Sequence, residues 1–182
     1  MTQTGGGGTD WSAGAHRALS GLGVGIVGYV PDAGLSRLIT LCQADNRMRS
    51  VPLTTEEEGI ALAAGAWLGG MPATVFMQSS GVGNIVNALA MMQTCRFPLV
   101  MLVTMRGELG EANEWQIPMG QAAAEVLRLA AVDVHRPERA EDIADTVAAA
   151  ATTAFRALRR EAVLIPQRIV GIKRFAGAGS GE

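Results

Sequence analysis

Residues 73–95 read ATVFMQSSGVGNIVNALAMMQTC. The run from Ala73 to Met77 is almost entirely apolar, which is typical of a β-strand buried on both faces. Serine and glycine follow it, and from Asn84 to Cys95 the apolar residues recur at helical spacing. We therefore expect a strand, a glycine loop and a helix in direct succession.

The same alternation continues on either side of this segment. Further apolar runs of strand length lie at 24–30, 99–104, 132–135 and 162–165, with a weaker candidate at 49–53. Helical periods lie at 33–44, 56–68, 118–130 and 139–160. This order predicts an α/β fold: an open parallel β-sheet with helices on both faces, in which ligands bind beyond the carboxyl ends of the strands.

The composition indicates one globular domain. The chain has 182 residues, of which 48% are hydrophobic and 18% charged, with a formal net charge of −2. This is too apolar for a disordered chain and not basic enough for a nucleic-acid partner. We expect the domain at 13–172, between glycine-rich flexible tails at 1–12 and 173–182. No apolar run reaches the length of a membrane span and no signal peptide is recognisable, so a cytoplasmic protein without a membrane partner is the expectation.

The cysteines and histidines carry no recognisable motif. Cys42 and Cys95 are far apart and both lie in helical pattern, so we expect two buried free thiols and no CxxC metal or redox site. Neither His16 nor His135 has a partner that spacing identifies, and both are interpreted as structural or surface residues. No metal site is predicted on this chain.

One apparent motif is rejected. Gly23, Gly25 and Gly28 match the GxGxxG dinucleotide fingerprint. That fingerprint must follow a strand and open a helix, whereas these glycines lie inside the first strand candidate and Pro31 comes soon after it. A flavodoxin-like nucleotide-binding protein remains an alternative, and it would be stabilised by a flavin or NAD without any partner.

Three glutamates open the helix at 56–68. Acidic side chains in a first helical turn complement the helix dipole, and Thr54 or Thr55 can cap it. The residues that follow are almost all Ala, Gly, Leu and Ile, and a helix that is apolar on every side is buried. At least one of these glutamates is therefore expected in a protected site, where its carboxyl group can exchange a proton.

Two polar loops complete the candidate site. The segment 77–84 follows a strand and opens a helix, so its backbone N–H groups form either an anion-binding loop or a tight structural turn. It lacks the Lys and Ser/Thr of a nucleotide-hydrolysing P-loop. The segment 105–117 is a long polar loop after a buried strand, and such loops are usually functional or mobile.

Several segments taken together resemble a known family. Glu57, followed by Gly59, Ala63, Ala64 and Trp67, is similar to the pyrimidine-domain helix of thiamine diphosphate-dependent 2-oxo acid decarboxylases. Ala66 and Trp67 stand where that family has glycine and tyrosine. The segments 29–32, 77–89 and 106–120 are similar to phosphonopyruvate and sulfopyruvate decarboxylases, and the resemblance spans roughly residues 25–168.

The resemblance implies a role for each matching residue. Glu57 would be the catalytic residue, which hydrogen-bonds N1′ of the cofactor's aminopyrimidine and moves its proton, while Glu56 and Glu58 point about 100° away on either side. The implied cofactor-binding residues, besides Glu57, are Pro31, Ser80, Gly81, Gly83 and Asn84. The implied substrate-binding residues are Asp32, Gln78, Ser79, Arg106 and Gln116. For Arg106 the alternative is a solvated loop arginine.

The resemblance also implies a partner. The family holds the cofactor's diphosphate through Mg²⁺ on a domain with a Gly-Asp-Gly motif, and this chain has no such motif. The implied protein is the alpha, pyrimidine-binding subunit of a hetero-oligomer whose beta subunit carries the diphosphate-binding domain. Its activity would be that of a carbon–carbon lyase, most readily converting 3-sulfopyruvate, a small anionic 2-oxo acid, to sulfoacetaldehyde and CO₂. The alternatives are a phosphonopyruvate decarboxylase subunit and a non-catalytic regulatory pyrimidine-domain subunit.

Overall fold

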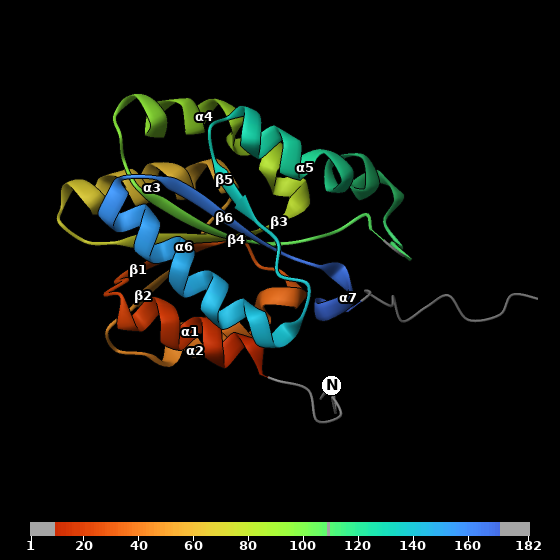
Figure 1. Ribbon diagram of the computed structural model, residues 1–182, viewed down its shortest axis with the longest axis horizontal. Coiled ribbons are helices and arrows are strands. Elements are labelled where there is room, and N and C mark those ends of the chain that lie inside the picture. Colours follow the sequence, from red (N-terminus) through yellow and green to blue (C-terminus); the bar gives the residue numbers. More distant parts are fainter. Residues whose placement is uncertain (1–9, 109, 172–182) are drawn as a thin grey trace, which may run out of the picture.

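The structure, a computed structural model, describes residues 10–108 and 110–171. Six parallel strands form one sheet in the order β2-β1-β3-β4-β6-β5 (Figure 1). The strands are β1 (Ile26–Tyr29), β2 (Arg49–Pro52), β3 (Ala73–Gln78), β4 (Leu99–Thr104), β5 (Asp133–His135) and β6 (Arg160–Ile165). Strands β3 and β4 are nearly continuous apolar runs, and β6 is buried along its whole length, because these strands lie in the middle of the sheet with helices on both faces.

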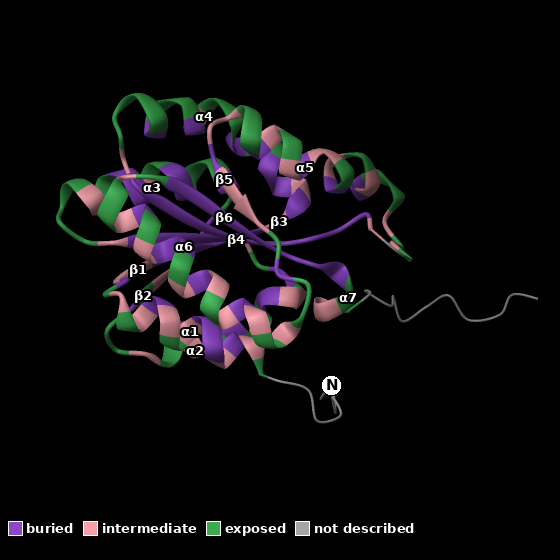
Figure 2. Cartoon of the chain, in the orientation of Figure 1, coloured by how far each residue is buried: buried purple, intermediate pink, exposed green. Residues whose placement is uncertain are grey.

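Helices cover both faces of the sheet. On one face lie α1 (Trp11–Gly21), α2 (Ser36–Ala44) and α6 (Ile143–Ala157), and on the other lie α3 (Glu56–Leu68), α4 (Val82–Thr94) and α5 (Ile117–Leu129). A short helix, α7 (Gln167–Val170), follows β6, and single 3₁₀ turns lie at η1 (Ala33–Leu35), η2 (Ser79–Gly81), η3 (Glu114–Gln116) and η4 (Ala140–Asp142). Each face has its own apolar core, and the central strands between the two cores are fully buried (Figure 2). The predicted fold class is confirmed.

The sheet brings the candidate site residues to one edge. The chain leaves β1 toward β2 on one side and returns to β3 on the other, which makes the carboxyl ends of β1 and β3 a topological switch point. In open α/β sheets, ligands bind at such a point. Asp32 follows β1, Ser79 follows β3, and Glu56 opens the helix that follows β2.

The sequence prediction missed α1 and misplaced several boundaries. Helix α1 begins at Trp11 and is capped by Asp10, so residues 10–12 of the expected N-terminal tail belong to this helix and its cap. The rest of that tail, at 1–9, and the expected C-terminal tail at 173–182 lie outside the described residues. The expected helix at 139–160 is shorter, because α6 stops at Leu158, which takes a left-handed conformation (φ 54°). Strand β6 then begins at Arg160, two residues before its expected start.

The two cysteines differ in environment. Cys42 is buried, and burial raises the pKa of its thiol to about 12. Cys95 is exposed, so the expectation of two buried thiols was wrong for this residue. Cys95 is the C-cap residue of α4, so it lies just beyond the helical residues whose apolar side chains face the core.

Among the described residues, no helix is both long enough and apolar enough to span a membrane.

Candidate active site

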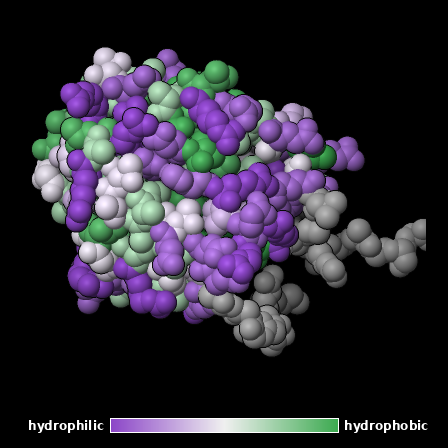
Figure 3. All heavy atoms as spheres, in the orientation of Figure 1, coloured by the Kyte–Doolittle hydropathy of each residue, from purple (hydrophilic) through white to green (hydrophobic). Residues whose placement is uncertain are grey.

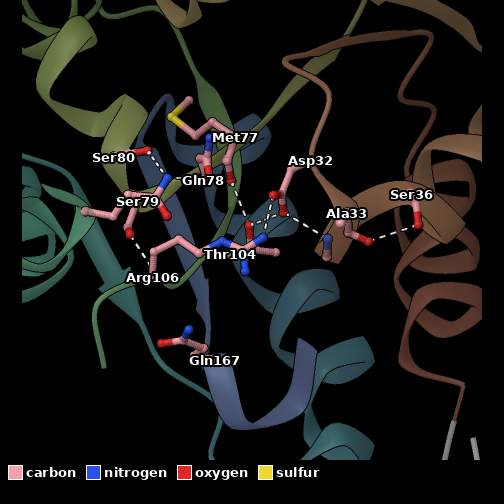
Figure 4. Close-up of polar contacts among 12 residues, drawn as sticks. Asp32, Ala33, Ser36, Met77, Gln78, Ser79, Ser80, Thr104, Arg106 and Gln167 are labelled. Carbon is pink, nitrogen blue, oxygen red and sulfur yellow. Dashed lines mark hydrogen bonds and ion pairs between the residues drawn. The ribbon is translucent and has the colours of Figure 1, made fainter. Parts of the chain in front are cut away.

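A buried ion pair joins the carboxyl ends of β1 and β4. Arg106 Nη2 lies 2.5 Å from Asp32 Oδ1, and the two side chains are only 2% and 1% exposed. Figure 4 shows the guanidinium of Arg106 reaching from the end of β4 toward Asp32. The structure therefore excludes a solvated loop arginine: the charge of Arg106 is balanced inside the protein.

Asp32 is also held by its other oxygen. Oδ2 accepts a hydrogen bond from the backbone N–H of Gly34 at 3.0 Å and another from Thr104 Oγ1 at 2.9 Å. The carboxylate thus ties the turn after β1 to the last residue of β4. Sequence reasoning did not select Thr104; the signal for it is its position as the final residue of a buried strand, at the edge where ligands bind.

The loop after β3 meets the loop after β4. The backbone N–H of Arg106 donates to Ser79 Oγ at 2.9 Å. Gln116 Nε2 donates to Gln78 Oε1 at 3.1 Å and to Ser80 Oγ at 3.5 Å. All five residues predicted for the substrate pocket therefore lie at this edge, in two neighbouring hydrogen-bonded clusters. One contains Asp32, Ser79 and Arg106, and the other contains Gln78 and Gln116.

One polar atom in each of these two clusters has no partner among the described residues. These atoms are Arg106 Nε, a donor, and Gln116 Oε1, an acceptor, and both are buried. Buried polar groups in folded proteins are nearly always hydrogen-bonded, so an unpaired donor and acceptor in neighbouring clusters point to a site that a ligand completes.

The polar loop after β4 is fastened to the start of α7. Glu108 and Gln167 exchange two hydrogen bonds, from Gln167 N to Glu108 Oε2 at 2.7 Å and from Glu108 N to Gln167 Oε1 at 3.0 Å. Gln167 Nε2 donates to Glu111 Oε2 at 3.0 Å. Partial burial raises the pKa of Glu111, but hydrogen bonds from the backbone N–H groups of Asn113 and Gly107 outweigh it and hold that pKa below its usual value. Sequence reasoning missed Gln167, which carries no motif.

The three glutamates of α3 have different environments. Glu57 is exposed, and so is Glu58, whose Oε2 accepts from the backbone N–H of Thr54 at 2.8 Å. Glu56 is buried, with 6% of its surface exposed. The expectation that one glutamate of this turn is protected is met by Glu56, whereas the implied catalytic residue, Glu57, faces solvent in the single chain.

The remaining cofactor-binding candidates lie on the loop between β3 and α4 and after β1. Ser80 and Gly81 belong to η2, and Gly83 and Asn84 to the first turn of α4. Pro31 is exposed and, together with Asp32, borders a surface hollow of about 470 Å³ between the end of β1 and α2. The structure thus groups the candidates at one edge of the sheet.

Both histidines have carboxylate partners that spacing did not reveal. His16 Nε2 lies 3.1 Å from Asp45 Oδ2, and His135 Nε2 lies 2.7 Å from Glu161 Oε2. Burial raises the pKa of Glu161. Glu161 is the second residue of β6 and Asp45 precedes β2, so both pairs lie away from the carboxyl edge. In the described part of the chain, no group of three or more His, Cys, Asp or Glu side chains could hold a metal ion.

Comparisons with known proteins agree with this geometry. A family model described as the thiamine pyrophosphate enzyme N-terminal TPP binding domain matches residues 12–126. The alpha subunit of sulfopyruvate decarboxylase from Methanothermobacter thermautotrophicus is 32% identical over 157 residues, which cover 86% of this chain and 95% of that subunit. The phosphonopyruvate decarboxylase of Streptomyces viridochromogenes is 41% identical over 113 residues, which cover 61% of this chain and 28% of that enzyme.

A solved structure shares the fold. The 2-oxoglutarate:ferredoxin oxidoreductase from Magnetococcus marinus superimposes with a TM-score of 0.70 at 13% sequence identity, and the match covers 94% of this chain and 34% of that one. At this identity the similarity concerns the architecture alone. The family resemblance predicted from the sequence is confirmed by the family model and by the alpha subunits.

Proposed function

The chain belongs to the thiamine pyrophosphate enzyme family, in its branch of sulfopyruvate decarboxylase alpha subunits, and from this premise we propose that it is the pyrimidine-binding subunit of a two-subunit 2-oxo acid decarboxylase. The observation that carries the proposal is the extent of the match. The chain aligns with 95% of a separate alpha subunit but with only 28% of a phosphonopyruvate decarboxylase. The match to nearly the whole of a separate alpha subunit supports a role as one subunit of a shared active centre.

The residues at the carboxyl edge fit the pyrimidine half of thiamine diphosphate. The exposed carboxyl group of Glu57 suits a ring nitrogen that must gain and lose a proton. The loop of Ser80, Gly81 and Gly83, which lies against the neighbouring Glu56, has no bulky side chains. The described residues offer no metal-ligand cluster for Mg²⁺ and the diphosphate. We assign that half of the site, and the Mg²⁺, to the partner subunit.

The reaction replaces a carboxyl group by a proton. In 3-sulfopyruvate, the bond between the carboxyl carbon and the 2-oxo carbon breaks, CO₂ leaves, and a proton added to the 2-oxo carbon gives sulfoacetaldehyde. Bound thiamine diphosphate supplies the electron sink for this step. Glu57 holds and moves a proton at N1′ of the aminopyrimidine, which is general acid–base work by a positioned carboxyl group.

Arg106 is the proposed ligand of the sulfonate group. Its Nη2 is engaged by Asp32, but its Nε–H is buried without a partner in the described structure and is a donor for a sulfonate oxygen. Ser79, Gln78 and Gln116 would line the same pocket. Because Arg106 is only 1% exposed, substrate entry requires the polar loop after β4 to shift.

The partner subunit would cover the face formed by α3, α4 and α5. Residues 59–95, which include α4 and nearly all of α3, contain no Asp, Glu, Lys, Arg or His. An apolar groove of about 470 Å³ runs between α4 and α5, lined by Val86, Ala90, Gln93, Val126, Leu129 and Ala130. In Figure 3, hydrophobic residues come to the surface at the top of the view, over these two helices. A charge-depleted, apolar face of this kind is typical of a subunit interface, and its closure would also remove Glu57 from water.

The test is turnover by the assembled complex. The chain is co-expressed with a partner subunit that carries Gly-Asp-Gly, and CO₂ release is measured from 3-sulfopyruvate and from phosphonopyruvate with thiamine diphosphate and Mg²⁺. We expect turnover of 3-sulfopyruvate, and a loss of about 10²–10⁴-fold in kcat for Glu57→Gln with assembly intact. The matched control, Glu58→Gln, changes a glutamate of the same turn that only accepts from Thr54 and should keep activity within about twofold of the unmodified complex.

Each other outcome selects an alternative. Faster turnover of phosphonopyruvate would favour the second substrate, which the 41% identity to its decarboxylase already makes the next candidate. Full activity of Glu57→Gln would refute the catalytic assignment and favour a regulatory subunit.

A further inference from the structure

Side chains, and not a backbone ladder, hold the chain after β4. The backbone N–H of Met105 still donates to the carbonyl oxygen of Ile165 at 2.9 Å. The next three N–H groups donate to side-chain oxygens: Arg106 to Ser79 Oγ at 2.9 Å, Gly107 to Glu111 Oε2 at 3.2 Å and Glu108 to Gln167 Oε1 at 3.0 Å. Because backbone N–H groups away from water must be paired, these acceptors decide where the backbone of Arg106 lies.

Gln167 controls two of these three contacts. Its Oε1 accepts from the N–H of Glu108, and its Nε2 donates at 3.0 Å to Glu111 Oε2, the acceptor for Gly107. Its own backbone N–H donates to Glu108 Oε2 at 2.7 Å. Gln167 is 1% exposed and follows β6, the neighbour of β4, so it lies next to the Arg106 loop (Figure 4). One buried side chain thus anchors this loop at Glu108 and at Glu111.

The position of the loop decides what the guanidinium of Arg106 can reach. The carbonyl oxygen of Arg106 lies so close to α5 that a Cβ added to Gly120 would be 1.8 Å from it. At the other end of the side chain, Nη2 is held by Asp32. Nε lies between these two fixed ends and is buried without a partner in the described structure. A shift of the loop backbone would therefore change where the Nε–H points.

We propose that Gln167 is a positioning residue for substrate binding, which anchors the loop after β4 so that Arg106 presents its Nε–H to the anionic tail of the 2-oxo acid. This inference rests on the proposed function, under which that tail is a sulfonate group. Gln167 acts through Glu108, Glu111 and the backbone of Arg106. A single hydrogen bond contributes little net stability, so these contacts can break and form again when the loop shifts to admit substrate.

The first test removes the polar contacts and keeps the length of the side chain. KM and kcat of Gln167→Met are measured on the complex with the partner subunit, for whichever of 3-sulfopyruvate and phosphonopyruvate the unmodified complex turns over faster. A contact made equally in the ground state and the transition state affects KM alone. We expect KM to rise about tenfold while kcat stays within about twofold.

Hydrogen exchange reports the contact itself. The exchange rate of the Glu108 N–H is measured by mass spectrometry on the same complex. Gln167→Met removes its acceptor, so exchange at this N–H should become about tenfold faster.

The second test makes the anchor depend on pH. In Gln167→Glu the new carboxyl group is buried beside Glu108 and Glu111, which raises its pKa above the usual value. The two cations nearby are already paired, Arg136 with Glu108 and Arg106 in its buried ion pair. At about pH 5.5 the neutral carboxyl can still donate to Glu111 and accept from Glu108, whereas at about pH 8 the ionised group has no proton to donate.

The expected signature of Gln167→Glu is therefore recovery in acid. Both complexes are measured at each pH, so that the pH dependence of the reaction itself cancels. The ratio of the variant's KM to that of the unmodified complex should be within about twofold of one at the lower pH and about ten at the higher pH.

The matched control is the next residue of α7. Arg168 is exposed and pairs with Glu138, away from the loop after β4. Arg168→Ala should leave KM, kcat and the exchange of the Glu108 N–H unchanged. An effect of Arg168→Ala equal to that of Gln167→Met would overturn the assignment to Gln167.

The outcomes separate this inference from the proposed function. A fall in kcat of Gln167→Met without a rise in KM, an unchanged KM with faster exchange, or no recovery of Gln167→Glu in acid would overturn the role of Gln167 while the decarboxylase assignment stands. An unmodified complex that turns over neither acid would overturn the proposed function and this inference with it.

Discussion

At the scale of single residues, the site depends most on the ion pair of Asp32 and Arg106. Removing one of its two charges should destabilise the protein more than removing both. Both side chains are nearly inaccessible to water, so each charge depends on the other for compensation. We expect Asp32→Asn to lower the free energy of unfolding by about 3–5 kcal/mol, because it leaves the guanidinium buried without a counter-charge. Urea denaturation of the chain measures this.

Two further variants make that prediction specific to the buried pair. Asp32→Asn combined with Arg106→Met removes both charges and should recover much of the lost stability. Glu125→Gln breaks the exposed pair between Glu125 and Arg128 and should cost less than about 1 kcal/mol. If Asp32→Asn lowered the free energy of unfolding no more than Glu125→Gln does, the charge of Arg106 would not depend on Asp32 for its compensation.

The sequence could indicate the chemistry of the candidate residues but not their orientation. Asp32 and Arg106 are both candidates for the substrate pocket. They are more than 70 residues apart in the sequence, so no local pattern indicates that their charges neutralise each other. Likewise, α3 is apolar on every side, so its pattern does not reveal which glutamate faces the interior. The tertiary contact with Asn84 decides that, and it buries Glu56 instead of Glu57.

At the scale of elements, two helical glycines should respond in opposite ways to alanine. A Cβ at Gly65 of α3 meets nothing within 4 Å, so Gly65→Ala should raise the free energy of unfolding by about 0.5–1 kcal/mol through helix propensity. A Cβ at Gly120 of α5 would overlap the backbone carbonyl of Arg106, which cannot move aside as a side chain can. Gly120→Ala should therefore lower the free energy of unfolding by about 1–3 kcal/mol or more.

Thermal and urea unfolding of the two variants check this prediction. A stabilising Gly120→Ala would show that the helix and the Arg106 loop are not in contact in solution. A destabilising Gly65→Ala would show that this surface of α3 is already covered in the single chain.

The elements that were predicted well are those with strong, uninterrupted periods. The strands β3 and β4 and the helix α3 match their expected bounds within a residue, because each is buried against neighbours that reinforce its pattern. Helix α1 was missed because its sequence, WSAGAHRALSG, is rich in glycine and serine. Its stability comes from packing: a Cβ at Gly14 would lie 2.8 Å from Cβ of Ala144 on α6, so the two helices approach closely.

At the scale of the whole molecule, the alternation of strands and helices predicted a parallel sheet but not the order of its strands. That β6 lies between β4 and β5 is a matter of long-range pairing, which no local pattern records. The order matters for the site, because it places Gln167, at the end of β6, beside the loop after β4. Local signals therefore gave the edge on which the site lies, and tertiary contacts determined which side chains meet there.

The surface of the molecule leads to the last prediction. Val86 is 41% exposed on α4 and Leu129 is 88% exposed on α5, and both line the groove on the charge-depleted face. Val86→Glu places a charge in the middle of the proposed interface, where it would lose its hydration without a partner. We expect it to weaken assembly with the partner subunit at least tenfold, as measured by analytical ultracentrifugation, while the unfolding temperature of the single chain changes little because the side chain is already accessible to water.

The matched control lies on the opposite face of the sheet. Ala149→Glu adds the same charge at an exposed position of α6, and it should assemble like the unmodified chain. Were Ala149→Glu to abolish assembly while Val86→Glu did not, the partner would dock on the face of α1, α2 and α6. Glu57 would then remain open to water on the other side of the sheet, and the proton exchange assigned to it would lack the enclosed site that it requires.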